Sequence, residues 1–561
     1  MFSRILIANR GEIAVRIART CRDLGVNTVA VHSDPDAGAR HVRLADDAVA
    51  LPGTASGDTY LNQEAIVVAA RRAGAEAIHP GYGFLAENHG FAAKVRDAGL
   101  VWIGPPPEVV RAVGDKVEAR GLARSAGVPV VPGLEDAPID RAAAADFART
   151  HGYPIAIKAA GGGGGRGLKV ARAEAEIEDA LAAARREAAA YFDDDTVYLE
   201  RYLEAPKHLE VQILAPRAAA PLWLGVRDCS FQRRHQKLIE ETPPPRHAGL
   251  VAAMGEAAVA LARACGYEGA GTVEFLVDAD GRFYFLEVNA RLQVEHTVTE
   301  EVLGIDLVAC QLKIAAGDQL GFGQADLVAR GHAIECRINA EDPARAFLPT
   351  PGRLTRYVEP GGPGVRVDSG FEEGDEVPDA YDSLIAKVIT TGDTRPNARA
   401  RMLRALGEMQ VDGVATTIPA NRLLLETDAF VAGSHTTATI SSERLLDALL
   451  DPGAPAVAGE GEVLLVQGRP ARLWHPAMAP SASAASRGAP PGGDLVAPMH
   501  GTVVDVLVAE GEEVEAGAPI AVLEAMKMET AVVSVRAGTV KRLLIAPGET
   551  VAAGATLAVV E

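Results

Sequence analysis

The stretch GTVEFLVDADGRFYFLEVNARLQVEH (271–296) consists of two runs of β-branched and aromatic residues joined by Asp280-Gly281. Asp-Gly between two such runs is typical of a two-residue type I′ turn, so we expect a β-hairpin. A two-residue loop at this position sets a register in which Glu274 lies directly opposite Glu287. Carboxylates that face each other across a strand pair repel, so we expect another group to offset their charge.

A divalent cation is the simplest group that offsets such a charge. Asn289 lies on the same face as Glu287, because it stands two residues further along the strand. Two carboxylates and an amide oxygen suit Mg²⁺, which normally completes its shell with water and nucleotide phosphates. The sequence therefore predicts a metal site at Glu274, Glu287 and Asn289. The alternative is a solvated pair of carboxylates that holds no ion.

A run of five glycines lies upstream, in IAIKAAGGGGGRGLKV (155–170). Each glycine costs roughly 0.5–1 kcal/mol relative to alanine in ordered structure, so five in a row indicate that the backbone itself has a task. A loop without side chains lets amide N–H groups approach phosphate oxygens closely. The run lacks the terminal Gly-Lys-Ser/Thr of a P-loop, and the alternative is a flexible linker.

The composition of the whole chain bounds its class. It has 561 residues, of which 48% are hydrophobic and 23% charged, as expected for several folded domains and not for a disordered or collagen-like chain. The net charge of −20 disfavours binding to nucleic acid or to anionic membranes. Five scattered cysteines without C-x-x-C spacing indicate reduced thiols. With no apolar run of membrane-spanning length and no signal-peptide core, we expect a cytoplasmic protein.

Pattern changes along the chain predict five parts. In chain order these are a parallel α/β domain (1–115), a mixed domain containing the glycine run (116–329), an α+β domain (330–447), a linker (448–494) and a small all-β domain (495–561). The linker is rich in Ala, Pro, Gly and Ser, and its stretch 481–493 is flexible by composition. We expect the apolar patch Val463–Trp474 inside it to form a small hairpin.

The last part contains an internal repeat. Residues 501–524 align with residues 538–561 at 14 of 24 positions. Neither half alone could bury its apolar face, so the two halves are expected to close into one pseudo-symmetric β-structure. Lys527 follows the first half, in EAMKM (524–528), where a turn would present it to solvent. The alternative is an ordinary exposed turn lysine, which is what an arbitrary lysine at such a position usually is.

Four segments carry a resemblance to a known family. HPGYGFLAEN (79–88), RDCSFQRRHQKLIEE (227–241) and FLEVNARLQVEH (285–296) resemble the signature segments of biotin carboxylase, an ATP-grasp enzyme, and the likeness covers about 1–447. EAMKM resembles the biotinyl domain of biotin-dependent carboxylases, whose lysine carries biotin through an amide. The resemblance implies a Rossmann-like N-terminal domain, an ATP-grasp domain and a C-terminal domain, followed by an all-β biotinyl barrel or sandwich.

The resemblance also implies roles for individual residues. The ATP-binding set is Lys116, Lys158, the lid Gly161, Gly162, Gly163, Gly164 and Gly165, the adenine hinge Glu200, Tyr202 and Leu203, the ribose contact His208, and Gln232, His235 and Lys237 on the phosphate side. The bicarbonate cradle is Arg291, Gln293 and Val294. Glu295 would be the general base, Arg337 would stabilise the biotin ureido anion, and Lys527 would carry biotin. We expect Cys229 only to pack.

The function implied by the resemblance is ATP-dependent carboxylation of biotin by bicarbonate, with Mg²⁺ or Mn²⁺. We expect the α subunit of an acetyl- or propionyl-CoA carboxylase of fatty acid biosynthesis. Expected partners are a biotin protein ligase, a separate carboxyltransferase β subunit and a second copy of the carboxylase part. The short 448–494 stretch leaves open how the β subunit docks. Two alternatives remain: an α-type subunit of a pyruvate or methylcrotonyl-CoA carboxylase, and a non-catalytic biotin carrier.

Overall fold

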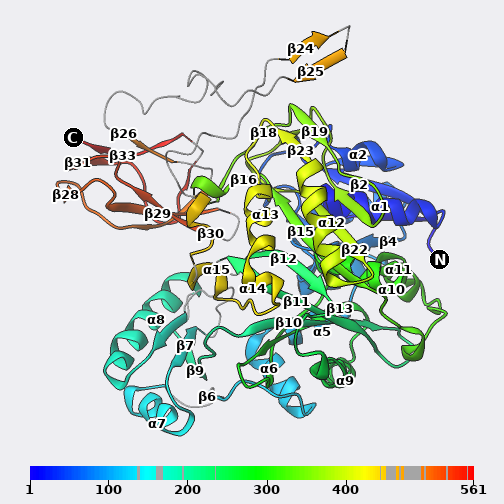
Figure 1. Cartoon of the computed structure of the whole chain (residues 1–561), viewed down its shortest axis with the longest axis horizontal. Coiled ribbons are helices and arrows are strands. Elements are labelled where there is room, and N and C mark those ends of the chain that lie inside the picture. Colours follow the sequence, from blue (N-terminus) through cyan, green and yellow to red (C-terminus); the bar gives the residue numbers. More distant parts are fainter. Residues whose placement is uncertain are drawn as a thin grey trace.

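A computed structural model of the chain describes residues 1–561 except 135–138, 160–167, 193–194, 234–235, 346, 443, 450–462, 467–468, 473–493, 498–500, 526–527 and 552–553. Figure 1 shows the N-terminal part in blue, a cyan unit at lower left, a long green and yellow sheet, and an orange-to-red β-structure at the C-terminus. Among the helices of the described ranges, none combines the length and the apolar character that a membrane crossing requires.

The N-terminal part is a five-stranded parallel sheet in the order β3-β2-β1-β4-β5. Its strands are β1 (Arg4–Ile7), β2 (Asn27–His32), β3 (Asp47–Ala50), β4 (Ala77–His79) and β5 (Val101–Trp102). Its helices are α1 (Gly11–Asp23), α2 (Arg40–Leu44), α3 (Gln63–Arg72), α4 (His89–Asp97) and α5 (Pro107–Gly114). The alternating strand and helix patterns of the sequence therefore form the predicted Rossmann-like domain.

Several helices begin where a short polar side chain caps them. Asn62 accepts a hydrogen bond from the backbone N–H of Ala65 in α3, and Asn88 accepts one from Phe91 in α4. Such caps satisfy amides that the first helical turn leaves free. Asn88 is the last residue of HPGYGFLAEN (79–88), so α4 begins where this segment ends. Glu87 immediately precedes the capping residue.

The cyan unit of Figure 1 is a four-stranded sheet in the order β6-β9-β7-β8, with two helices beside it. Its elements are β6 (Gly133–Leu134), α7 (Arg141–His151), β7 (Ile155–Ala159), β8 (Leu168–Ala171), α8 (Ile177–Phe192) and β9 (Val197–Arg201). Helix α6 (Lys116–Ser125) leads into this unit. The glycine run stands between β7 and β8 in the sequence, and it lies outside the described residues.

An eight-stranded sheet forms the centre of the molecule, in the order β14-β13-β10-β11-β12-β15-β22-β20. Its strands are β10 (Lys207–Ala215), β11 (Leu222–Arg233), β12 (Gln236–Thr242), β13 (Gly269–Val277), β14 (Phe283–Asn289), β15 (His332–Asn339), β20 (Val365–Ser369) and β22 (Leu384–Gly392). Since β12 pairs with β15, one continuous sheet links residues 116–329 with residues 330–447. Strand β10 is buried along its whole length.

Helices and short strands cover this sheet. The helices are α9 (Val251–Ala264), α10 (His296–Leu303), α11 (Leu307–Ala316), α12 (Arg395–Glu408), α13 (Ile418–Glu426), α14 (Asp428–Val431) and α15 (Thr439–Ser442). The short strands are β16 (Glu341–Asp342), β17 (Leu348–Pro349), β18 (Gly352–Arg353), β19 (Arg356–Val358), β21 (Glu376–Val377) and β23 (Gln410–Asp412). Buried side chains from β12, β15, β22, α12 and α13 form one hydrophobic core against the sheet.

The predicted two-residue turn at Asp280-Gly281 is wrong, although the predicted pairing of Glu274 with Glu287 is confirmed. The loop has three residues, because the backbone N–H of Asp278 donates to the carbonyl of Arg282, and Gly281 adopts a positive φ of 78°. A three-residue loop shifts the register by one residue. A bulge at Leu286 restores it, so the two deviations cancel before the carboxylates are reached.

The C-terminal β-structure confirms the predicted closure of the two repeat halves. Its strands are β26 (Asp494–Val496), β27 (Gly501–Val506), β28 (Glu513–Val514), β29 (Pro519–Ala525), β30 (Met528–Val533), β31 (Gly538–Leu543), β32 (Thr550–Val551) and β33 (Thr556–Val560). Strand β28 of the first half pairs with β31 of the second, and β32 pairs with β27. The equivalent residues Val503 and Val540 are both fully buried in the shared core. Each half thus completes the sheet of the other.

The expected hairpin in the linker is also present. Strands β24 (Val463–Val466) and β25 (Arg469–Arg472) pair antiparallel, drawn in orange at the top of Figure 1. An isolated two-stranded hairpin is at best marginally stable in water.

Candidate active site

A row of three glutamates crosses the central sheet where β14, β13 and β10 lie side by side. Glu287 pairs with Glu274, and Glu274 pairs with Glu210. Glu210 is fully buried and Glu274 is 5% exposed. Three carboxylates in adjacent register positions concentrate negative charge in a region that excludes water, so nearby cations must compensate for it.

Lys237 of β12 is one of these cations. Its Nζ lies 2.6 Å from Glu210 Oε2, 3.0 Å from Glu274 Oε1 and 2.6 Å from Glu295 Oε1. Burial works to lower the pKa of Lys237, but the carboxylates of Glu210, Glu274 and Glu295 hold that pKa well above its ordinary value. Lys237 therefore keeps its proton and joins the glutamate row to Glu295.

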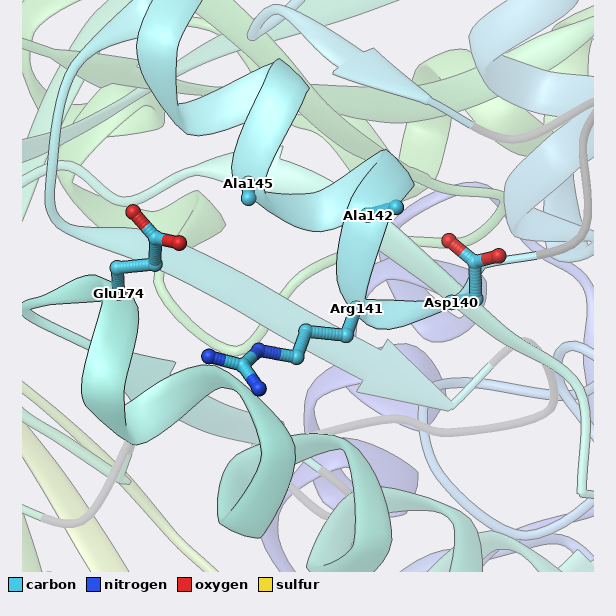
Figure 2. Close-up of a pocket in the computed structure, with 5 residues that line it drawn as sticks. All are labelled: Asp140, Arg141, Ala142, Ala145 and Glu174. Atoms are coloured by element: carbon cyan, nitrogen blue, oxygen red, sulfur yellow. The ribbon is translucent and has the colours of Figure 1, made fainter.

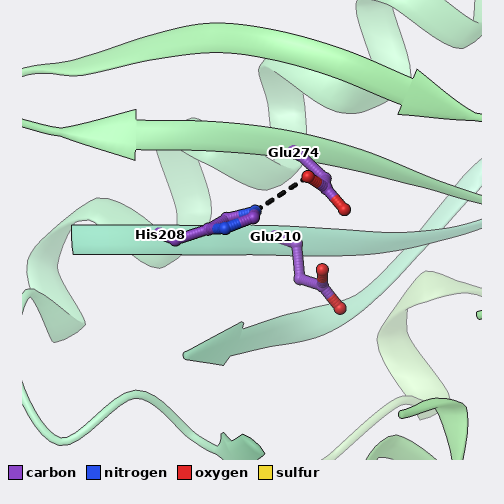
Figure 3. A group of neighbouring side chains, drawn as sticks. All are labelled: His208, Glu210 and Glu274. Atoms are coloured by element: carbon purple, nitrogen blue, oxygen red, sulfur yellow. Dashed lines mark hydrogen bonds and ion pairs between the residues drawn. The ribbon is translucent and has the colours of Figure 1, made fainter. Parts of the chain in front are cut away.

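His208 contributes a second contact to the same row (Figure 3). Its Nε2 lies 2.8 Å from Glu274 Oε2, and the Nε2 of Gln232 lies 3.2 Å from its Nδ1. Figure 3 shows the imidazole directed at the Glu274 carboxylate, with Glu210 extending from the same strand as His208. Burial would lower the pKa of His208, but the Glu274 carboxylate raises it above the usual value.

Glu295 lies at the start of α10, fully buried between two cations. Besides Lys237 it meets Arg337 of β15, whose Nη2 lies 2.9 Å from Glu295 Oε2. Burial would raise the pKa of Glu295, but Lys237 and Arg337 hold it well below its usual range. The carboxylate is therefore ionised and able to accept a proton. Beside it, the Nζ of the buried Lys387 donates to the backbone oxygen of Val294 at 2.8 Å.

The segment between β14 and Glu295 presents Arg291 and Gln293. The Nη2 of Arg291 donates to Asn289 Oδ1 at 2.7 Å, and the Nε2 of Gln293 donates to Glu274 Oε1 at 2.9 Å. Arg291 Nε lies 2.9 Å from Glu87 Oε2, and Glu87 Oε1 accepts from the backbone N–H of Ala290 at 3.1 Å. The N-terminal domain thereby fixes the position of this segment of the central sheet.

Two further predicted lysines come from β7 of the cyan unit and from the start of α6. Lys158 of β7 and Arg120 of α6 both pair with the buried carboxylate of Glu200. Burial lowers the pKa of Lys116, which begins α6, while the Glu287 carboxylate opposes that shift.

Of the residues predicted for the adenine hinge, Leu203 is buried and Tyr202 half-buried, and both follow β9 directly. The predictions for Gly161–Gly165, His235 and Lys527 lie outside the described residues.

The donor set at the row suits a divalent cation. The side chain of Glu287 forms no hydrogen bond or ion pair within the described ranges, and burial together with the Glu274 charge raises its pKa against the opposing pull of Lys116. Asn289 donates its amide nitrogen to Glu274 Oε1 at 2.9 Å. A carboxylate without an ion-pair partner in the described ranges, beside a second carboxylate and an amide oxygen, is an arrangement that Mg²⁺ would stabilise.

Four residues of this site were missed by the sequence reasoning: Glu87, Glu210, Arg227 and Glu240. Arg227 is fully buried, pairs with Glu210, and also donates to Thr299 Oγ1 at 2.9 Å. Glu240 accepts from the Nε of Arg337 at 2.6 Å. Arg227 and Glu240 lie in the segment RDCSFQRRHQKLIEE (227–241). Its unusual density of charged residues in a strand pattern could have indicated that they belong to the site.

The hollow shown in Figure 2 is a different place. It is lined by Asp140, Arg141, Ala142, Ala145 and Glu174, between α7 and the segment that precedes α8. These lining residues include none of the predicted site residues, and they belong to the cyan unit alone. We therefore assign the chemistry to the glutamate row.

Four family models match the chain in succession. They are the biotin carboxylase N-terminal domain (1–110), the ATP-binding domain of the carbamoyl-phosphate synthase L chain (115–322), the biotin carboxylase C-terminal domain (335–442) and the biotin-requiring enzyme model (493–560).

Individual proteins match over long ranges. The biotin-dependent acyl-coenzyme A carboxylase alpha3 subunit of Mycobacterium leprae is 45% identical over 563 residues, which covers 95% of this chain and 94% of that protein. One pyruvate carboxylase subunit of Methanothermobacter thermautotrophicus is 48% identical over 450 residues, 80% of this chain and 91% of that protein. A solved structure is the biotin carboxylase domain dimer of Hydrogenobacter thermophilus 2-oxoglutarate carboxylase with ADP, its magnesium salt and bicarbonate. It has a TM-score of 0.75 and 43% identity, and the match covers 80% of this chain and 98% of that one.

Proposed function

This chain belongs to the biotin carboxylase family, and from that membership we propose that it is the α subunit of an acyl-CoA carboxylase. Members of the family carboxylate biotin with bicarbonate in an ATP-dependent ligase reaction. In our proposal the carboxyl group then leaves on the carrier domain of the same chain. A separate β subunit transfers it to acetyl-CoA or propionyl-CoA.

One observation carries this proposal: the match to the alpha3 subunit spans carboxylase and carrier together. It covers 95% of this chain and 94% of that protein, whereas the match to the pyruvate carboxylase subunit covers 80% of this chain. Because this match covers the carboxylase part and the carrier part in the same order, it supports the same roles for the two parts of this chain. The pyruvate acceptor is the second candidate, because the carboxylase part alone is 48% identical to the pyruvate carboxylase subunit.

The first half-reaction uses the groups around Glu295. Bicarbonate would bind to Arg291, Gln293 and the backbone N–H of Val294, and Glu295 would remove its proton. The ion pairs with Lys237 and Arg337 keep Glu295 ionised and ready for that proton. Lys116, Lys158 and Lys237 would neutralise charge on the transferred phosphoryl group.

Mg²⁺ held by Glu274, Glu287 and Asn289 would supply further positive charge on the ATP phosphates. His208 and Gln232, which are hydrogen-bonded to each other, would contact the nucleotide on the same side, where His208 also meets Glu274. Attack of the deprotonated bicarbonate oxygen on the γ-phosphorus of ATP would release ADP and form carboxyphosphate. Carboxyphosphate hydrolyses readily, so Gly161–Gly165 would close over the phosphates and exclude water.

The second half-reaction would take place beside Arg337. Carboxyphosphate breaks down to CO₂ and phosphate, and phosphate takes the N1 proton of biotin. Arg337 would stabilise the negative charge that develops on the ureido oxygen while N1 captures CO₂. Biotin attached to Lys527 would then leave for the β subunit. A biotin protein ligase would attach the biotin, and the carboxylase part would form a homodimer in the cytoplasm.

The proposal is tested by isolating the native complex through a tag on this chain. The complex is incubated with ATP, Mg²⁺ and labelled bicarbonate, and acetyl-CoA, propionyl-CoA, methylcrotonyl-CoA or pyruvate is added separately. We expect label in acetyl-CoA or propionyl-CoA, and a carboxyltransferase subunit in the isolated complex. The same complex containing Glu295→Gln is the matched control. Label found only in pyruvate or methylcrotonyl-CoA would contradict the proposed acceptor.

A further inference from the structure

Glu240 of β12 and Glu335 of β15 face each other beside the site. The two residues are directly paired in the antiparallel register, and both are fully buried. Opposed Cβ atoms in such a pair lie about 4.5–5.5 Å apart, a separation at which two charged carboxylates repel strongly in a dry interior. None of the roles assigned above uses this pair.

The cations that touch the pair are too few for two full charges. Arg337 contacts Glu240 through Nε at 2.6 Å and Nη2 at 2.5 Å, but the same Nη2 also serves Glu295. Among the described residues, Glu335 has the Thr297 hydroxyl as its hydrogen-bond partner. Glu240 Oε2 and Glu335 Oε1 are buried and have no hydrogen-bond partner within the part of the chain that the structure describes. A buried carboxylate oxygen without a partner is costly when charged, and a proton removes that cost.

We propose that Glu240 and Glu335 share one proton at neutral pH, and that this proton sets how much of the Arg337 charge is available to the reaction. The proposal rests on the function proposed above for Arg337, and it makes the pair a positioning device for that residue. With one proton, the pair carries a single negative charge, which anchors the Nε edge of Arg337. With none, a second negative charge competes for the same guanidinium.

The surroundings of the pair agree with this assignment. The titratable and charged groups that face it are Cys229 of β11, Lys237 of β12, Glu295 at the start of α10, Cys336 and Arg337 of β15, and Lys387 of β22. Burial raises the pKa of Glu240 to about 8 and that of Glu335 to about 7, against the opposing pull of Arg337 and Lys387. The pair therefore loses its proton only as the pH rises above neutrality.

The consequence for activity has a definite sign. Below the pKa of the pair the proton is present, and Arg337 can stabilise the ureido anion. As the pH rises through that pKa, the second charge appears and carboxylation of biotin falls. Glu335→Gln removes the titrating partner and keeps its shape, so the alkaline fall should move up by about one pH unit or more. The rate at neutral pH should remain close to that of the unmodified chain.

The experiment measures two independent quantities on the full chain. Infrared difference spectra between neutral and alkaline pH report the C=O stretch of protonated carboxyls, and carboxylation of free biotin is followed across the same range. Glu341→Gln is the matched control: Glu341 is also buried, with Oε1 hydrogen-bonded to Ser383, Asn339 and Gln236 and Oε2 without a partner in the described ranges, but it forms no ion pair with Arg337 there. We expect Glu335→Gln to lose a carboxyl band and to shift the alkaline fall, and Glu341→Gln to leave that fall unchanged.

Two other outcomes would contradict the proposal, and each contradicts a different claim in it. A Glu335→Gln spectrum that keeps every band of the unmodified chain would mean that the pair holds no proton. A lost band with an unshifted alkaline fall would mean that the proton does not act on Arg337. Glu240→Gln gives the same spectral reading if Glu335→Gln does not fold. If the unmodified chain failed to carboxylate free biotin, the proposed function would fail, while the infrared bands would still decide whether the pair holds a proton.

Discussion

Two β-hairpins bear on the proposed activity, and they place their functional residues in opposite ways. In β13–β14 the residues Glu274 and Glu287 stand in mid-strand, where the register sets their separation. In β29–β30 the last described pair is Ala525 with Met528, so Lys527 falls between the strands in sequence. Groups that must act together are fixed by pairing, whereas the group that must travel is placed between paired strands.

The difference also predicts how each region responds to mutation. Around Glu295 and Lys237 every charge has buried partners, and removal of one partner from such a cluster typically costs about 3–5 kcal/mol. The predicted biotin-bearing residue, Lys527, stands between β29 and β30 in the sequence, so a change there would remove the attachment point and leave the carboxylase cluster intact. We therefore expect large effects on catalysis from the first region, and selective loss of carrier function from the second.

The largest effect is expected for Glu295→Gln. Glutamine keeps the shape of the residue but cannot accept the bicarbonate proton, so turnover should fall by about 100-fold or more while ATP still binds. Bicarbonate-dependent ATPase activity and nucleotide affinity are the measurements. Glu301→Gln, on the helix that follows Glu295, is the control and should retain activity. Near-normal ATPase activity in Glu295→Gln would show that the base has been assigned wrongly.

Glu287→Gln should weaken Mg·ATP binding and, at the same time, stabilise the free protein. Loss of groups that support a metal costs about 10–100-fold in affinity, and a direct ligand should cost at least as much. Removal of one of two opposed carboxylates relieves roughly 0.2–1 kcal/mol of repulsion. Thermal unfolding with and without Mg·ATP measures both effects. A variant that is less stable without ligand would argue that Glu287 has a stabilising partner.

A smaller effect is expected for Glu87→Gln, which breaks the ion pair with Arg291. The side chain of Glu87 is 43% exposed, so we expect a rise in the KM for bicarbonate of about tenfold or less, with kcat nearly unchanged. Glu108→Gln breaks an exposed ion pair with Arg96 in the same domain and serves as the control. A fall in kcat at unchanged KM would mean that Glu87 does more than orient Arg291.

The smallest effect concerns the linker. A flexible chain as long as the 19 residues 476–494 spans roughly 22–26 Å r.m.s. From the composition of this stretch we expect it to hold the carrier close and still let it leave. Deletion of residues 481–493 should therefore slow the overall reaction several-fold more than carboxylation of free biotin. Replacement of the same residues by a Gly/Ser stretch of equal length is the control. Equal losses in both assays would contradict a travelling carrier.

The comparison of the two hairpins also shows what the sequence could predict. The repeat predicted the closed carrier domain, because each half visibly lacked a partner for its apolar face. The pairing of Glu274 with Glu287 was predicted correctly from a wrong turn, since the bulge at Leu286 compensated for a loop one residue longer. The Asp280-Gly281 turn signal therefore predicted the correct carboxylate pairing only because the bulge cancelled the error in loop length.

Other site residues depend on contacts that no local pattern contains. Glu210 joins the row because β10 pairs with β13, about 60 residues further along the chain. Glu87 reaches Arg291 from another domain, and Glu240 meets Glu335 through the β12–β15 pairing. Such long-range neighbours follow from the order of strands in the sheet, which spacing along the sequence does not reveal.

The central claim is that one chain holds a complete carboxylase site and a separable carrier. Lys527→Arg tests it most directly, with carboxylation of free biotin and of acyl-CoA measured on the same preparation, and biotin incorporation as the third reading. The account predicts that biotin incorporation and acyl-CoA carboxylation are abolished while free biotin is still carboxylated at close to the unmodified rate. Loss of free-biotin carboxylation, or retained acyl-CoA carboxylation, in Lys527→Arg would contradict it.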